Sequence, residues 1–186
     1  MRLFRPNPRR RYNRPVPASP EFAASLPSGP ATIRAALGAA AEAWVASLGP
    51  RLVSIVLFGS VARGDATESS DVDLLVVAEG FPARLSARRQ ELLKLYAPVR
   101  EARQLPFIEW NLVTKTPDEA RVHSPLYLDM VEDGRLLFDR DGFFAGVLER
   151  MRARMRELGS QRVFLPDGSW YWDLQPGFRF GGEVRI

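Results

Sequence analysis

The chain has 186 residues, of which 46% are hydrophobic, a content typical of one globular domain with a buried core. The sequence lacks an apolar run of the roughly 20 residues that span a membrane, an apolar signal segment, and cysteine. These properties exclude disulfides and thiolate metal sites, and they lead us to expect a soluble, cytoplasmic protein without membrane contact.

The positive charge is concentrated in residues 1–30. The whole chain has a net charge of +4; this segment holds six arginines against one acid, Glu21, whereas the remainder carries 20 basic and 21 acidic residues. The segment is also rich in proline, so we expect a disordered or extended tail. Any binding of nucleic acid is expected from this tail, and a solvated leader is the alternative.

Helical and strand patterns alternate from residue 32 onward. Apolar residues at every third or fourth position predict a helix over 32–48. The β-branched run over 52–58 predicts a strand that is buried on both faces. Ser60 is expected to cap a short helix, and a second strand over 72–77 and a helix over 83–99 follow.

Residues 106–114 alternate between apolar and polar, which predicts a third strand with Glu109 and Asn111 on its polar side. Because helices alternate with short strands, we expect an α/β (α+β) fold in which helices pack on one face of a small mixed sheet. Residues 31–157 are expected to form the domain, and 158–186 an aromatic appendage packed on it. The remaining predicted elements are short helices beginning near Pro117 and Pro125, a strand over 135–139 and a helix over 143–158.

A glycine–serine pair closes the first predicted strand. A strand that ends at Gly59 and Ser60 and leads into a helix leaves backbone N–H groups without partners, and the helix dipole favours a phosphate there. The Ser60 hydroxyl is expected to donate to a phosphate oxygen. Arg63 is expected to contact the same charge, the alternative being an ion pair with Asp65 or Asp71.

Asp71 and Asp73 lie two positions apart on the second predicted strand, so their side chains share a face, roughly 6.5 Å apart by strand rise. Two such carboxylates suit Mg²⁺, which takes one or two carboxylates together with substrate phosphate oxygens. Two-metal phosphoryl transfer usually uses a third carboxylate. Glu109 is the candidate because it lies on the polar side of its strand. The predicted catalytic and metal-binding residues are therefore Asp71, Asp73 and Glu109.

The order of these residues resembles a known family. Gly59-Ser60, then ten residues, then the D-x-D pair of Asp71 and Asp73 look like the signature of the DNA polymerase β-type nucleotidyltransferases. The chain is also similar in size to the minimal nucleotidyltransferases, and the resemblance covers about residues 31–157. Two later segments look like those of bacterial and archaeal members: 126–134 and 172–177.

The resemblance implies a polymerase-β-like fold and transfer of a nucleoside monophosphate, AMP from ATP being the expected case, to an acceptor hydroxyl with Mg²⁺ or Mn²⁺. Family members of this size are often encoded beside a HEPN-domain toxin and act as its antitoxin, so a HEPN-type protein is the expected partner. Aspartate is the commoner third acid, which makes Glu109 a departure. The alternatives are an aminoglycoside-like small-molecule nucleotidyltransferase and an antitoxin that acts by contact alone.

Two further features receive structural interpretations. His123, the one histidine of the sequence, is expected to be structural, because the chemistry of the family needs no histidine base. The cluster Trp170-Tyr171-Trp172 is expected to pack over the body or to meet a partner, with stacking on a base as the alternative.

Overall fold

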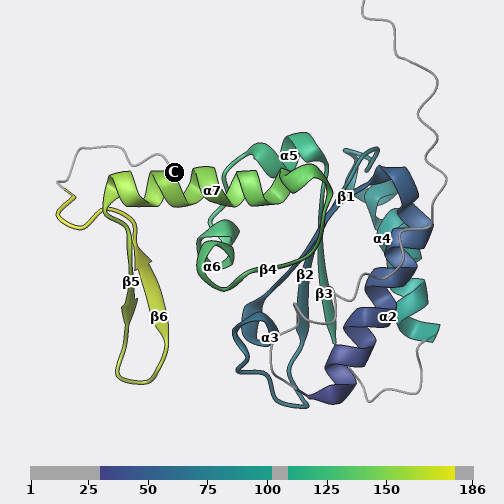
Figure 1. Ribbon diagram of the computed structural model, residues 1–186, viewed down its shortest axis with the longest axis horizontal. Coiled ribbons are helices and arrows are strands. Elements are labelled where there is room, and N and C mark those ends of the chain that lie inside the picture. The colour runs from purple at the N-terminus through teal and green to yellow at the C-terminus, as the bar shows by residue number, and fades with distance from the viewer. Residues whose placement is uncertain (1–29, 102–108, 179–186) are drawn as a thin grey trace, which may run out of the picture.

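A four-stranded mixed sheet forms the centre of the protein (Figure 1). The computed structural model describes residues 30–101 and 109–178. The strand order is β3-β2-β1-β4; β1 pairs antiparallel with β2 and β4, whereas β2 and β3 are parallel. The mixed sheet expected from the sequence is thereby confirmed. The strands are β1 (Leu52–Phe58), β2 (Val72–Ala78), β3 (Trp110–Lys115) and β4 (Arg135–Asp139).

Helices cover both faces of this sheet, which corrects the expectation that they pack on one face. One face packs against α2 and α4, and the other against α5, α6 and α7 (Figure 1). The short helix α3 connects β1 to the loop that precedes β2. The helices are α2 (Ala31–Leu48), α3 (Gly59–Arg63), α4 (Leu85–Glu101), α5 (Pro117–Arg121), α6 (Leu126–Asp133) and α7 (Phe143–Leu158), with single 3₁₀ turns at Gly49–Arg51 and Arg140–Gly142.

The two layers of helices follow from the sequence of the central strands. Successive side chains of a strand point to opposite faces, and β1 is apolar at nearly every position. Ile55 packs in the cluster that contains Trp44 of α2, whereas Val56 packs in the cluster that contains Phe144 of α7. Both faces of β1 therefore need an apolar cover, as is usual for strands buried on both sides.

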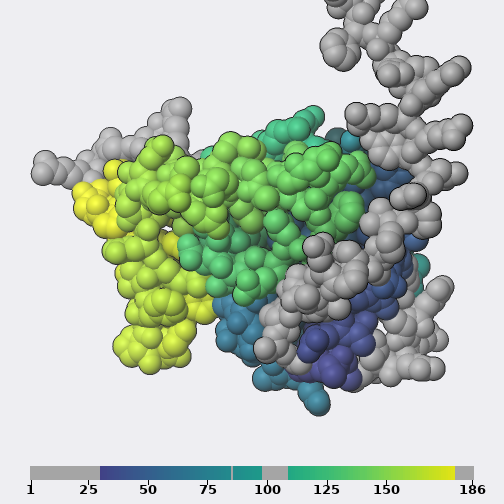
Figure 2. Space-filling model, in the orientation of Figure 1, coloured from purple at the N-terminus to yellow at the C-terminus, as the bar shows by residue number. Residues whose placement is uncertain are grey.

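A β-hairpin follows α7, where the sequence indicated only an aromatic appendage. It consists of β5 (Gln161–Phe164) and β6 (Trp170–Asp173), which pair antiparallel. The hairpin extends away from the end of α7 (Figure 2). A turn with Gly168 in the left-handed region, at φ 84°, joins the two strands.

Some expectations fall outside the described residues. They include residues 1–29 of the predicted tail and 106–108 of the predicted third strand. The division of the chain into tail, domain and appendage stays a prediction. Among the described helices, none combines the length and the apolar content that crossing a membrane requires.

Candidate active site

The predicted phosphate site lies at the junction between β1 and α3. The helix begins at Gly59, with Phe58 in the capping position and without a side-chain capping hydrogen bond. The expectation that Ser60 caps this helix is therefore wrong. Gly59 turns the chain at φ 73°, a conformation that glycine adopts at little cost, and the helix starts two residues earlier than a Ser60 cap would imply.

Gly59 lies directly against Asp73. Phe58 and Asp73 are paired across β1 and β2, so the end of one strand lies beside the start of the other. A Cβ atom built on Gly59 would lie 3.0 Å from Asp73 Cγ and would overlap its Oδ2. A residue without a side chain is therefore required where the backbone of α3 meets the acid pair.

The two aspartates share one side of the sheet and one hydrogen-bond donor. Asn111 Nδ2 donates to Asp71 Oδ2 at 2.7 Å and to Asp73 Oδ1 at 3.1 Å. The parallel register of β2 and β3 places Asn111 beside Asp73. Both aspartates are partly exposed. The arrangement therefore presents two carboxylates toward one point, next to the start of α3.

The charge of the pair is only partly compensated. Partial burial raises the pKa of Asp73 above its ordinary value of 3.8, and the neighbouring charge of Asp71 acts in the same direction. The hydrogen bond from Asn111 and the positive charge of Arg63 act in the opposite direction, but the net pKa shift is upward. A site with this excess of negative charge favours a cation.

Arg63 extends from α3 beside these groups. Its Nε donates to Asp65 Oδ2 at 3.0 Å, and its side chain is only 21% exposed. Its charge also influences the pKa of Asp73. The ion pair with Asp65 that we considered from the sequence is therefore formed. Arg63 remains near enough to the acid pair to contribute positive charge there.

Glu109 is not brought together with the acid pair. Its side chain is exposed, and its backbone oxygen accepts a hydrogen bond of 2.8 Å from the backbone N–H of Val72. Among the residues that the structure describes, no group of three or more aspartate, glutamate or histidine side chains forms a metal site. The side chain that contacts both aspartates is Asn111, which the sequence placed on the polar side of the same strand without assigning it a role.

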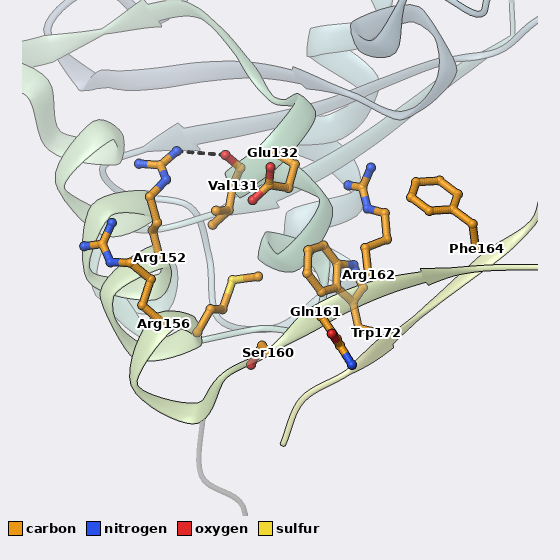
Figure 3. A pocket seen from close by; sticks show the side chains of 10 residues that line it. Val131, Glu132, Arg152, Arg156, Ser160, Gln161, Arg162, Phe164 and Trp172 are labelled. Atoms are coloured by element: carbon orange, nitrogen blue, oxygen red, sulfur yellow. Dashed lines mark hydrogen bonds between the residues drawn. The ribbon is translucent and has the colours of Figure 1, made fainter. Parts of the chain in front are cut away.

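A separate pocket of about 390 Å³ lies between α6, the end of α7 and the hairpin (Figure 3). No residue predicted for the site lines it. Arg152 and Arg156 extend into this region, and both guanidinium groups pair with Glu149. Arg152 also donates to the backbone oxygen of Val131 at 2.8 Å. The acid pair and this pocket are therefore distinct features.

Comparison with known proteins identifies the family. A family model described as "Nucleotidyltransferase domain" matches residues 42–137, more than half of the chain. "Putative protein adenylyltransferase MJ1305" of Methanocaldococcus jannaschii is 35% identical over 112 residues, which are 59% of this chain and 74% of that protein. "Putative protein adenylyltransferase MJ0604" of the same organism is 59% identical over 29 residues, which are 16% of this chain and 29% of that protein.

Solved structures have weaker similarity. A crystal structure of a toxin–antitoxin with AMP-PNP is 22% identical, with a TM-score of 0.43, and the match covers 64% of this chain and 90% of that one. At this TM-score the likeness adds nothing to the family assignment. The family model, the archaeal relative and the glycine-to-aspartate geometry agree. The chain belongs to the nucleotidyltransferase domain family and is a nucleotidyltransferase.

Proposed function

We propose that this nucleotidyltransferase transfers AMP from ATP to a hydroxyl group of a partner protein, with Asp71 and Asp73 binding a divalent cation beside the triphosphate. The observation that carries the proposal is the contact between Gly59 and Asp73. It joins the start of α3, where backbone N–H groups favour phosphate, to a pair of carboxylates. A phosphate and a cation bound at this junction would be neighbours.

The acid pair fits a divalent cation. A single nitrogen, Asn111 Nδ2, reaches a carboxylate oxygen of each aspartate, so the two carboxylates face one point, and we place the bound ion there. Mg²⁺ and Mn²⁺ take carboxylate, phosphate and water oxygens, and Mg²⁺ needs only one or two carboxylates from the protein. When bound, such an ion supplies positive charge that offsets the charge of the phosphate oxygens.

The protein's own groups bind and orient the donor. The backbone at Gly59 and the hydroxyl of Ser60 bind phosphate oxygens, and Arg63 adds a guanidinium group on the same side. The acceptor oxygen then forms a bond to the α-phosphorus of ATP. The bond from that phosphorus to the oxygen bridging the β-phosphorus breaks, pyrophosphate leaves, and the hydroxyl proton passes to solvent. Orientation of the reacting atoms is the main contribution of these residues.

The protein acceptor is proposed on two grounds. The relative MJ1305 is named as a protein adenylyltransferase, and the motifs resemble those of nucleotidyltransferases that act as antitoxins of HEPN-domain toxins. We therefore propose a HEPN-type protein as the acceptor. The addition of AMP would neutralise its toxicity by placing a bulky anionic group on a toxin side chain.

The test uses the purified full chain together with the purified product of the adjoining gene. Label from [α-³²P]ATP is expected to appear on that protein, whereas label from [γ-³²P]ATP is not. The variant Asp71→Asn/Asp73→Asn is expected to transfer no label. Asp118→Asn is the matched control, because the Asp118 side chain is 95% exposed on α5 and is expected to leave transfer unchanged. Equal transfer by the double variant would contradict the proposal.

The third carboxylate is a separate matter. Glu109 stays a prediction as a metal ligand, because the proposal needs only the two aspartates. A half-turn of the Asn111 amide would present Oδ1 in place of Nδ2 and would supply a third oxygen at the same point. Glu109→Gln with transfer equal to that of the unmodified chain would remove Glu109 from the ligand set.

A further inference from the structure

The hairpin of β5 and β6 lies outside residues 42–137, the span that the family model matches, yet it contacts α3 at the candidate site. The guanidinium carbon of Arg63 lies over the ring of Trp170, 4.7 Å from its centroid. Arg63 is the last residue of α3, and Trp170 is the first residue of β6. The appendage and the candidate phosphate site are therefore in direct contact.

A second guanidinium group lies near the same ring. The Cζ atom of Arg162 is 5.2 Å from the ring centroid of Trp170 and 5.1 Å from that of Trp172. Arg162 pairs with Trp172 across the hairpin, and Trp170 lies two positions before Trp172, so the three side chains share one face. Cations near aromatic rings attract the electron-rich ring faces, so this face of the hairpin forms a series of cation–π contacts.

Asp129 of α6 fixes this face to the body of the protein. Its Oδ1 accepts from the indole N–H of Trp170 at 3.2 Å and from that of Trp172 at 2.9 Å. Arg162 donates to the same oxygen at 3.4 Å and to Asp133 at 2.8 Å. The core side of α6 is buried, so the position of the Trp170 ring is set by a well-packed helix.

The ring in turn restricts Arg63. Arginine loses rotamer freedom when it binds a ligand, and an arginine that is already held loses less. Two groups hold Arg63, namely the carboxylate of Asp65 and the ring of Trp170. Asp65 lies only two positions after Arg63 in the sequence, whereas the Trp170 ring belongs to the distant hairpin. Removal of the ring would leave the guanidinium group with more freedom to move.

We propose that Trp170 is a positioning residue of the nucleotide site, which holds Arg63 in place for the triphosphate and makes the hairpin a part of donor binding. The proposal rests on the proposed function, in which Arg63 contacts the triphosphate. It assigns the hairpin, which lies outside the span of the family model, a role in binding the nucleotide donor. Trp170 acts through Arg63 and does not itself touch the nucleotide.

The test is a double-mutant cycle on binding of α,β-methylene-ATP with Mg²⁺, measured by calorimetry on the full chain. Trp170→Leu removes the ring but keeps apolar bulk, and it is expected to weaken binding roughly two- to tenfold. Trp170→Phe keeps a ring and is expected to bind more tightly than the leucine variant. Tyr171→Ala is the control, since Tyr171 is the neighbouring hairpin residue with its side chain on the opposite face, is 52% exposed, and is expected to leave binding unchanged.

The cycle is completed with Arg63→Ala. In that background Trp170→Leu is expected to have no further effect, because its effect passes through Arg63. Additive losses would mean that Trp170 touches the nucleotide directly, which would overturn the proposal, as would unchanged binding by Trp170→Leu.

A nucleotide-free measurement separates this proposal from the proposed function. The Nε–H resonance of Arg63, observed by NMR, is expected to shift in Trp170→Leu and to remain in place in Tyr171→Ala. An unmoved resonance in Trp170→Leu would overturn the positioning role. Failure of the unmodified chain to bind the nucleotide would instead contradict the proposed function, while the resonance would still report whether the ring lies over Arg63.

Discussion

Asn111 lies beside Asp73 in the parallel pairing of β3 with β2, and its side-chain amide donates to the Asp73 carboxylate at 3.1 Å. The same nitrogen also reaches Asp71, so one neutral side chain connects both acids. An amide at this position stabilises the pair without adding negative charge. It can also present either a donor or an oxygen to the point where the carboxylates converge.

The charge at residue 111 should control the response to divalent cations. Asn111→Asp is expected to lower the melting temperature without a divalent cation, because three carboxylates would repel one another. It is expected to raise the stabilisation that Mg²⁺ gives above that of the unmodified chain. Asn111→Ala removes the shared donor and is expected to cost about 1 kcal/mol of unfolding free energy. A melting temperature of Asn111→Asp that does not respond to Mg²⁺ and to EDTA would refute this account.

Gly59→Ala is expected to abolish binding of ATP. The added methyl group would overlap the Asp73 carboxylate and force it away from the start of α3. The left-handed conformation at φ 73° adds a strain of roughly 1–2 kcal/mol. The matched control is Gly142→Ala, because Gly142 has φ 65° and an added Cβ there would meet no atom within 4 Å beyond its chain neighbours and its own helical turn.

Both glycine variants should therefore lose stability in urea unfolding, while only Gly59→Ala should lose ATP binding in calorimetry. Retained binding by Gly59→Ala would show that the contact with Asp73 is not needed at the site.

Acid should destabilise the protein partly through Glu119. Hydrogen bonds from Arg88, at 2.9 Å to each carboxylate oxygen, lower the pKa of Glu119 below its ordinary value of 4.5. The pair therefore contributes stability above pH 4.5, and this contribution is lost as the pH falls through the lowered pKa of the folded state. Glu119→Gln keeps the capping hydrogen bonds with Thr116 but removes the charge.

We expect the glutamine variant to be less stable than the unmodified chain near neutral pH and to lose less stability on acidification. Urea unfolding at pH 6.5 and pH 3.5 measures both values. An equal loss in the two proteins would exclude a contribution of the pair with Arg88.

The sequence was sufficient to predict the elements that follow local rules. The apolar run of β1, the acidic pair at the start of β2 and the Gly59 junction each depend on nearest neighbours, and the structure contains all of them, with Asp71 directly before the strand and Asp73 on it. A strand that is apolar at nearly every position already required cover on both faces. The apolar pattern of β1 therefore already indicated helices on both faces, and the expectation of helices on one face was inconsistent with it.

The remaining features depend on pairings between distant segments. Which side chain of β3 reaches the aspartates is set by the parallel register, which puts Asn111 beside Asp73, and a single sequence does not give that register. The hairpin did carry a local signal, since Pro166-Asp167-Gly168-Ser169 is a turn sequence between two runs that contain aromatic residues. The contact of Trp170 with Arg63 had no local signal, because both the hairpin and α6 must be in place before it forms.

Calorimetric titration of α,β-methylene-ATP into the full chain with Mg²⁺, compared with Asp71→Asn/Asp73→Asn under the same conditions, tests directly whether the two aspartates and a divalent cation hold the triphosphate. This analogue cannot release pyrophosphate, so binding is measured without transfer. We expect the unmodified chain to bind the analogue, and we expect the affinity to fall by at least about tenfold with EDTA or in the double variant. Equal affinity in all three cases, or no binding by the unmodified chain, would contradict this expectation.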